Sequence, residues 1–385
     1  MSLKEFLQAN EQEMLNLLER LVNIDSGSTN KEGIDEVGTI LKACYEEIGF
    51  TTEVFKNDQN GNNLLFTYKG AEKPSLVFVA HMDTVFKKGT AQKRPFKIEG
   101  NRAYGPGVID MKASQVALLY AMKALKENNE DALKSVQIIL NGDEEIGSPT
   151  SRGLIESTAK GKSYALIMEP ARKDGSLVTA RRGGGRYSIY VKGKAAHSGI
   201  EPQAGISAIE ELAHKIVKLH ALTNHEEGIS VSVGLIEGGE SVNTIAPSAV
   251  GHVDVRITLT EQAAILDRQI REICATPDVS GTSITLEGGI NRPPMVKNDM
   301  TIMLLNIIKE KGRELGIDIT DVATGGGSDA SFTSAVGVPT IDGLGPVGGG
   351  AHSEEEYLEV PSLIERTNLL AELCVELSKK TSVTV

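Results

Sequence analysis

The sequence is poor in features that would fix its class at once. It has three cysteines, Cys44, Cys274 and Cys374, which are far apart, and it contains no Cys-x-x-Cys pair. This usage predicts small buried side chains in a reducing compartment, with a nucleophilic cysteine as the weaker alternative. No Gly-x-Gly-x-x-Gly follows the first predicted strand, which argues against a dinucleotide-binding enzyme.

Long apolar runs and a surplus of positive charge are also missing. No run of roughly 18 apolar residues occurs, so we expect no transmembrane helix and no membrane partner. Residues 1–24 have apolar side chains at helical spacing, which predicts one amphipathic helix rather than a signal peptide, with the cytoplasm as the expected location. The net charge of −12 argues against nucleic acid as a partner, because non-specific binding needs clustered Lys and Arg.

What the chain does have is an ordinary globular composition over 385 residues, enough for two or three domains. Its first third alternates helical and buried-strand patterns. Helices are expected at 31–48 and 113–128, and strands at 64–70, 75–83, 135–145 and 164–170. Several of these apolar strands end in acids or histidine. Since ligands bind at the carboxyl ends of strands in open α/β sheets, the pattern predicts an α/β domain with a site along that edge.

The composition changes at residues 180–199, where glycines indicate a hinge or tight turns. Strand, helix, strand, strand, helix and strand patterns follow at 186–193, 203–220, 229–236, 248–258, 260–276 and 282–288. That order is the ferredoxin-like split motif. Helical patterns then return at 299–315 and 361–380. We therefore assign residues 1–181 and 294–385 to two parts of a catalytic domain, and residues 182–293 to an inserted domain.

Five polar clusters stand at the ends of buried strands or in Gly-rich loops. They are His81 with Asp83, Asp110, Glu144 with Glu145, Glu169, and His352. Each alone has an ordinary explanation: Asp110 would be a helix cap, and the acids would be solvated turns. Together they match the mixed nitrogen and oxygen ligation of two divalent ions that share a carboxylate. Adjacent acids also permit two roles, in which one binds metal and the other is the general base.

The segments around these residues resemble the glutamate carboxypeptidase-type di-zinc metallopeptidases. Relatives of that family include tripeptidase, acetylornithine deacetylase and succinyl-diaminopimelate desuccinylase. HMDTV, YGPGVIDMK, GDEEIGS, MEPAR and AHSEEE carry the resemblance, in the family's order. The resemblance implies a zinc-peptidase-like, three-layer catalytic domain with a mixed sheet. It also implies that the insert is an α+β lid or dimerisation domain.

The resemblance further implies a role for each polar cluster. Asp110 would bridge both ions, His81 and Glu169 would bind one ion, and Glu145 and His352 would bind the other. Glu144 would be the general base and acid, and Asp83 would orient His81. The peptide bond from Asp110 to Met111 is often cis in the family.

In the insert and the following loop, the resemblance points to residues that would contact substrate. They are His197, Asn243, Arg256, Arg292 and Gly326. His197 would reach an active site across a homodimer formed through the lid. Arg256 and Asn243 would anchor a substrate carboxylate, although Arg256 has a simpler explanation as a salt-bridge partner of Asp254. The backbone amides around Gly326 could face the same carboxylate.

The expected activity is therefore hydrolysis of a peptide or amide bond next to a free carboxylate, with two metals activating water. The expected partner is a small peptide or an N-acyl amino acid. An N-acyl amino-acid deacylase or desuccinylase is the alternative within the same chemistry. An inactive, metal-stabilised binding protein ranks low, because all the presumed ligands and Glu144 are present. Zn²⁺ is the expected metal, and Co²⁺ or Mn²⁺ also suits these ligands.

Overall fold

The computed structural model describes residues 1–381 of the chain, which fold as two compact units. The first unit contains Met1–Ala180, Lys297–Thr324 and the chain from Ser328 to the last helix, and the second contains Arg181–Val296 with Gly325–Gly327. The second unit is thus slightly wider than the predicted insert. It also takes in three glycines that the sequence placed in the catalytic domain. These glycines group with the second unit because two of their carbonyls bind its first residue: the Arg181 guanidinium donates to Gly326 O at 3.1 Å and to Gly327 O at 3.2 Å.

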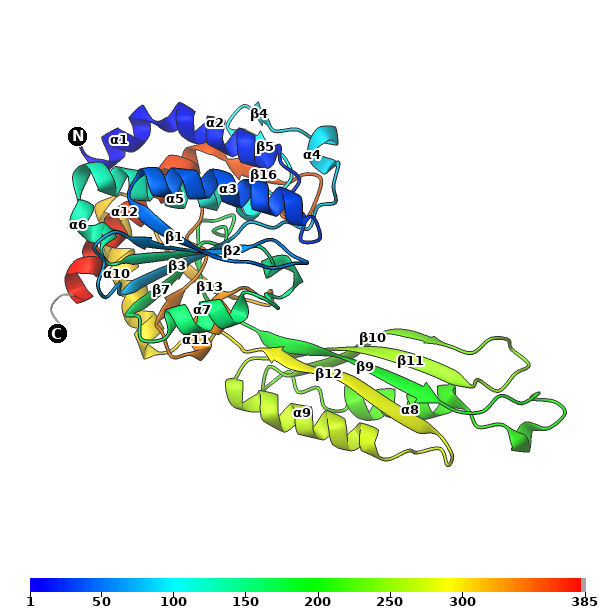
Figure 1. Cartoon of the computed structure of the whole chain (residues 1–385). Coiled ribbons are helices and arrows are strands. Elements are labelled where there is room, and N and C mark those ends of the chain that lie inside the picture. Colours follow the sequence, from blue (N-terminus) through cyan, green and yellow to red (C-terminus); the bar gives the residue numbers. More distant parts are fainter. Residues whose placement is uncertain (382–385) are drawn as a thin grey trace. The chain divides into compact units, whose positions relative to one another are not determined.

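The first unit is built on a six-stranded mixed sheet (Figure 1). Its order is β1 (Phe50–Phe55), β2 (Asn63–Tyr68), β6 (Val136–Asn141), β3 (Leu76–His81), β7 (Tyr164–Ile167) and β14 (Thr340–Ile341). β1, β2 and β6 are antiparallel neighbours, whereas β6, β3, β7 and β14 run parallel. Every residue of β3 is buried, as its apolar sequence predicts for a central strand. The predicted α/β class with a mixed sheet is confirmed.

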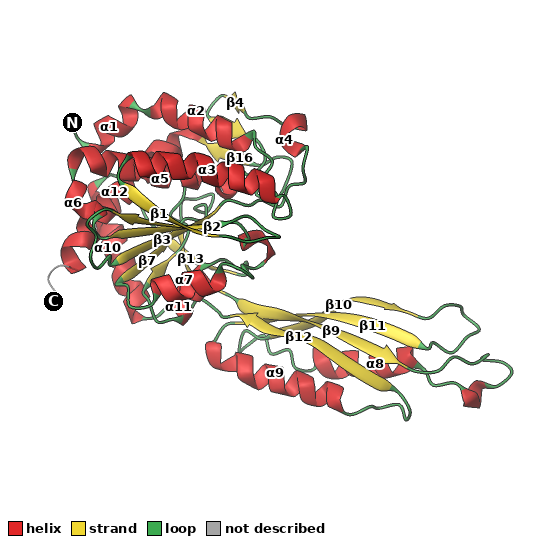
Figure 2. Ribbon diagram, in the orientation of Figure 1, coloured by secondary structure: helices red, strands yellow, loops and turns green. Residues whose placement is uncertain are grey.

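Helices cover both faces of this sheet, as Figure 2 shows in red. One face carries α1 (Leu3–Ala9), α2 (Glu11–Val22), α3 (Lys31–Glu47), α5 (Ala113–Asn128) and α12 (Val360–Thr381). α10 (Asp299–Glu314) packs against α12. The other face carries α7 (Arg152–Ala159) and α11 (Ala330–Ala335). α5 is buried almost all round, which fits its run of Ala and Leu. In the part of the chain that the structure describes, no helix has the length and apolarity needed to cross a bilayer.

The prediction of a single N-terminal helix is wrong. The segment forms two helices, α1 and α2, which break at Asn10. Asn10 has φ −104° and ψ 8°, and its side chain donates to Phe6 O at 2.7 Å. A side-chain amide that satisfies a helix-end carbonyl competes with continuation of the helix. Apolar periodicity runs through both helices, so it did not reveal the break.

Short strands complete the first unit. A second sheet contains β4 (Lys97–Glu99), β5 (Arg102–Tyr104), β15 (Gly348–Gly349) and β16 (Tyr357–Glu359). Separately, β8 (Leu177–Arg181) pairs with β13 (Asp321–Thr324). Two helices, α4 (Thr90–Lys93) and α6 (Glu130–Leu133), are single turns. β16 pairs with β5, so the chain after residue 349 lies beside the chain that leads to Asp110.

The second unit has the predicted ferredoxin-like order. β9 (Gly183–Lys192), α8 (Ala208–His220), β10 (Ser230–Gly238), β11 (Ser248–Ile257), α9 (Thr260–Ala275) and β12 (Ser283–Arg292) give an antiparallel sheet in the order β10-β11-β9-β12. The unit has its own apolar core, in which Leu212 of α8 and Ile270 of α9 meet the sheet. The buried Lys215 ammonium binds Glu211 at 2.9 Å and Asp278 at 2.7 Å, which fixes α8 to the chain after α9.

Candidate metal site

Three parallel strands bring most of the candidate ligands to one edge of the large sheet. His81 is the last residue of β3, and it pairs with Asn141 at the end of β6. Glu144 and Glu145 lie in the short 3-10 turn Glu144–Ile146 that follows β6, and Glu169 follows β7. Because carboxyl ends of parallel neighbours meet at the same edge, residues far apart in sequence converge there.

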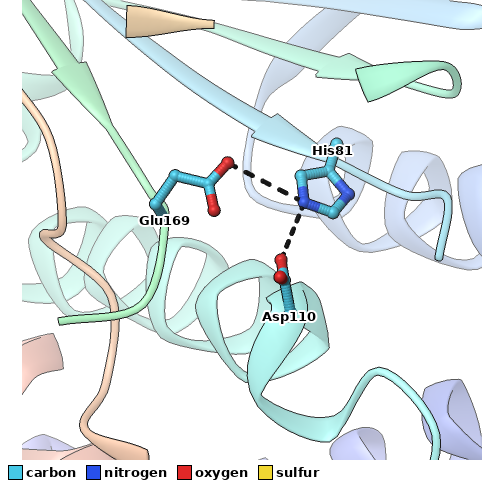
Figure 3. Close-up of side chains that lie close together, drawn as sticks. All are labelled: His81, Asp110 and Glu169. Carbon is cyan, nitrogen blue, oxygen red and sulfur yellow. Dashed lines mark hydrogen bonds and ion pairs between the residues drawn. The ribbon is translucent and has the colours of Figure 1, made fainter. Parts of the chain in front are cut away.

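The first ligand group, called here the buried group, is His81, Asp110 and Glu169 (Figure 3). His81 Nε2 lies 3.0 Å from Asp110 Oδ1 and 3.9 Å from Glu169 Oε1. One ligand atom from each residue lies within 4.8 Å of the others. The His81 side chain is only 1% exposed, so this group faces the interior of the first unit.

The second ligand group, called here the outer group, is Asp110, Glu145 and His352. His352 Nε2 lies 3.3 Å from Asp110 Oδ2 and 3.2 Å from Glu145 Oε2. The His352 side chain is 53% exposed, and its backbone has φ 67°, in the left-handed region that residues other than glycine seldom adopt. The outer group therefore depends on a loop conformation and not only on strand ends.

Asp110 belongs to both groups through different oxygens. Its Oδ1 faces His81 and its Oδ2 faces His352. This is the arrangement expected of a carboxylate that bridges two cations. The peptide bond from Asp110 to Met111 is cis, as the resemblance led us to expect.

Asp83 supports the site at two places. His81 Nδ1 lies 2.8 Å from Asp83 O and 3.5 Å from Asp83 Oδ1, so the backbone carbonyl is the nearer partner of the imidazole. The Asp83 carboxylate accepts from Ser28 Oγ at 2.7 Å and from the backbone amides of Glu144 and Glu145 at 3.1 and 3.2 Å. Asp83 thus anchors the turn that carries both acids, in addition to contacting His81.

The charged groups of the site shift one another's pKa values strongly. Burial acts to lower the pKa of His81, but hydrogen bonds to Asp110 and Asp83 raise it well above its usual value. Hydrogen bonds to Asp110 and Glu145 raise the pKa of His352 to about 10. Burial, together with the charge of Asp110, raises the pKa of Glu169 well above its ordinary range. The raised pKa values of both imidazoles reflect the negative charge of the carboxylates around them.

The donor set fits a pair of divalent cations. Two imidazoles and three carboxylates supply the nitrogen and oxygen ligands that Zn²⁺ and similar ions prefer. Glu145 Oε1 is buried and accepts no hydrogen bond from residues 1–381, although buried carboxylate oxygens normally have a partner. His81 and Glu169 would hold one ion, Glu145 and His352 the other, and Asp110 both.

The candidate residues of the second unit form two separate sets. Arg256 and Arg292 lie on β11 and β12, and both pair with Gly184 of the strand between them. Arg256 donates to both carboxylate oxygens of Asp254, at 2.8 and 3.0 Å, which is the salt bridge that the sequence left open. Gly327 packs on Arg292, since a Cβ there would lie 3.0 Å from Arg292 Cδ.

His197 and Asn243 lie together beyond the other end of the same sheet. The backbone of His197 pairs with Thr244, and Ser198 N donates to Asn243 O at 3.0 Å. This set lies past Lys192, the residue at the far end of β9 from Gly184. Eight strand residues span roughly 26 Å, so one copy of this unit cannot bring His197 and Arg256 to the same small substrate.

Sequence reasoning missed two residues that the structure places next to candidate residues. Arg181 binds the carbonyls of Gly326 and Gly327, and Glu356 accepts from the backbone amides of Ile109 and of Asp110 itself. Arg181 stands in a glycine-rich stretch that predicted only a hinge. Glu356 is the third of three adjacent glutamates, and only its complete burial separates it from Glu354 and Glu355.

This α/β scaffold, with two ligand groups that share a carboxylate, defines a metal-dependent hydrolase. Residues 77–376 match the model of peptidase family M20/M25/M40, and the chain belongs to this family. It is 30% identical to carboxypeptidase G2 of Pseudomonas sp. (strain RS-16) over 94% of this chain and 89% of that protein. It is 26% identical to the succinyl-diaminopimelate desuccinylase of Janthinobacterium sp. (strain Marseille), over 90% and 94%. The fold matches aminopeptidase PepT from Bacillus cereus with a TM-score of 0.77 at 21% identity, covering 96% of this chain and 99% of that one. The sequence-based assignment to a two-metal peptidase family is confirmed.

Proposed function

We propose that this M20 metallopeptidase is of the carboxypeptidase type, and that it hydrolyses a peptide or amide bond next to a free carboxylate. The observation that carries the proposal is the pair of ligand groups joined by Asp110, with Glu144 beside them. Glu144 belongs to neither group, yet its charge contributes to raising the pKa of Glu169. A carboxylate that is near the ligands without being one of them is suited to move protons.

In this proposal, each residue has a defined task. Two bound metal ions would act as Lewis acids, which polarise the scissile carbonyl and lower the pKa of a bound water molecule. Glu144 accepts the proton of the attacking water and returns it to the leaving amine. Asp83 keeps Glu144 in place, because its carboxylate accepts the backbone amides of both Glu144 and Glu145. The separation of roles between neighbouring acids is then fixed by a short 3-10 turn.

The insert is proposed to act as the lid and the homodimerisation domain. Arg256 and Arg292, with the amides around Gly326, would anchor the substrate carboxylate. Guanidinium groups suit a carboxylate because they donate in a planar fork. His197 and Asn243 lie at the far end of the sheet, so they would act on the active site of the other subunit. Asn243 therefore accompanies His197, instead of sharing a carboxylate with Arg256 as the sequence suggested.

Deacylation of an N-acyl amino acid is the second candidate. The similarity to a desuccinylase over 90% of the chain favours it, and the same site geometry serves both reactions. Carboxypeptidase activity ranks first because carboxypeptidase G2 shares more of the sequence, at 30% identity. Zn²⁺ is the proposed metal, with Co²⁺ or Mn²⁺ as substitutes, and the cytoplasm is the proposed location.

A substrate panel tests this proposal. Purified protein is loaded separately with Zn²⁺, Co²⁺ and Mn²⁺, and is given dipeptides, tripeptides, N-acetyl amino acids and N-succinyl amino acids. Each substrate is paired with its C-terminal amide as the matched control. Cleavage of the free-acid peptides but not of their amides, abolished by chelator, is the expected result. Cleavage of the N-acyl amino acids alone would move the function to the second candidate, and no cleavage with any metal would refute both.

A further inference from the structure

Glu356 is a buried acid beside the loop that carries Asp110. Its side chain is completely buried, and it lies four residues after His352, immediately before β16. Its Oε2 accepts from Gly107 N at 2.9 Å. Its Oε1 accepts from Ile109 N at 2.9 Å and from Asp110 N at 3.0 Å. One carboxylate therefore binds three backbone amides of the loop that carries the shared ligand.

This loop has two backbone hydrogen bonds of its own, from Val108 N to Gly105 O at 3.2 Å and from Lys112 N to Gly107 O at 3.0 Å, and neither uses the three amides that Glu356 binds. Its nearest regular pairing is that of Tyr104 with Tyr357, six residues before Asp110. Gly107 has φ 71°, and a Cβ there would lie 2.5 Å from the Thr84 side chain, so the chain turns sharply at this point. Buried amides need acceptors, and here a single side chain supplies all three. The direction in which Asp110 leaves the loop thus depends on Glu356.

Glu356 lies on the same loop as His352, a member of the outer group. Glu356 follows His352 in a loop closed at both ends by the pairing of β15 with β16. The contact from Glu356 to Asp110 N therefore links the segment that supplies His352 to the segment that supplies Asp110. In contrast, His81 and Glu169 are held by the large sheet, and Glu356 contacts neither in the hydrogen bonds of the described chain.

We propose that Glu356 is a positioning residue for the metal pair, which holds the Asp110 carboxylate at the spacing from His352 that the outer ion requires. The inference rests on the proposed two-metal function. It assigns to Glu356 a larger effect on the outer ion than on the buried ion, because Glu356 joins the segments of Asp110 and His352, whereas His81 and Glu169 follow strands of the large sheet. A residue that only stabilised the fold would lower the unfolding temperature and leave the affinity for both ions unchanged.

The test compares Glu356→Gln with the control Glu355→Gln in the full-length protein. Glutamine keeps the size of the side chain, but its amide group would face a backbone N–H that now donates to a carboxylate oxygen. Glu355 is adjacent and exposed, and it belongs to neither ligand group. Metal stoichiometry and affinity are measured by calorimetric titration with Zn²⁺, and the Co²⁺ absorption spectrum reports coordination. Hydrolysis is measured over a range of free metal concentrations.

The expected result for Glu356→Gln is an affinity for the second ion that is weaker by about tenfold or more, with a smaller loss for the first ion. An equal loss for both ions would contradict the inference. Its kcat should recover as free metal is raised, and Glu355→Gln should match the wild type. If Glu356→Gln does not fold, Glu356→Asp withdraws the carboxylate by one methylene and should give the same selective loss. Wild-type affinity for both ions in the folded variant would overturn the inference. A wild-type protein that binds two ions but hydrolyses nothing would refute the proposed function alone.

Discussion

The two ligand groups differ in how the chain builds them. In the buried group, His81 and Glu169 come from the ends of neighbouring parallel strands, and His81 is 1% exposed. In the outer group, His352 is 53% exposed and comes from a loop with a left-handed backbone. The comparison shows that the sheet fixes half of the site, whereas loop contacts hold the other half. The buried group should therefore be the more rigid and the more tightly occupied.

The largest expected effect comes from a change that leaves both groups intact. Glu144→Gln should lower kcat by about 10²–10⁴-fold, because the variant loses proton transfer but keeps every ligand. Steady-state kinetics and metal analysis on the same preparation measure this. Two bound ions together with near-wild-type turnover would show that another residue moves the proton.

A pair of variants tests the difference in burial directly. In chelator, His81→Ala should lower the free energy of unfolding by about 3 kcal/mol, because it removes the buried imidazole that faces both Asp110 and Glu169 and leaves Asp110 only the half-exposed His352. His352→Ala should cost less than His81→Ala, because half of the His352 side chain is in water and its contacts with Asp110 and Glu145 are screened. Urea unfolding of the two metal-free variants provides the measurement. Equal losses would mean that burial does not separate the groups.

Chelation should remove the two ions in order. The outer group is more accessible, so we expect a competing chelator to withdraw its ion first and the buried ion at concentrations about tenfold higher or more. During the titration, the ratio of bound metal to protein should show a plateau near one ion per chain. A single step from two ions to none would indicate that the ions bind as one cooperative unit.

The last expected effect is a pH dependence of metal binding. The pKa of His352 is raised to about 10, so in the metal-free protein its imidazole carries a proton at neutral pH. An ion must displace that proton, and the apparent affinity of the outer group should rise about tenfold per pH unit between about pH 6 and pH 8. Calorimetry in buffers of different ionisation enthalpy should detect about one released proton. Affinity independent of pH would mean that His352 is neutral before metal binds.

The strand-end half of the site was predictable from sequence, because its physical causes are local. A fully buried parallel strand reads as a continuous apolar run, and the polar residue that ends it marks the edge of the sheet. His81 and Glu169 were found in this way. The ferredoxin-like order of the insert was predictable for a similar reason, since its strand and helix periods are clear.

The remaining features depend on tertiary contacts that a sequence pattern does not carry. Glu354, Glu355 and Glu356 look alike in the sequence, and only the fold buries the third. The glycines around Gly326 join the second unit because the Arg181 guanidinium binds their carbonyls. The separation of His197 from Arg256 was within reach of the sequence, because the length of the predicted strands already places them at opposite ends.

The backbone at the root of the second unit closes on itself. Arg181 N donates to Met295 O at 3.0 Å, and Met295 N donates to Arg181 O at 3.1 Å. A segment whose first and last residues are bonded to each other can be excised without stretching the polypeptide that remains, so a short turn joining residues 180 and 297 should leave the mixed sheet folded.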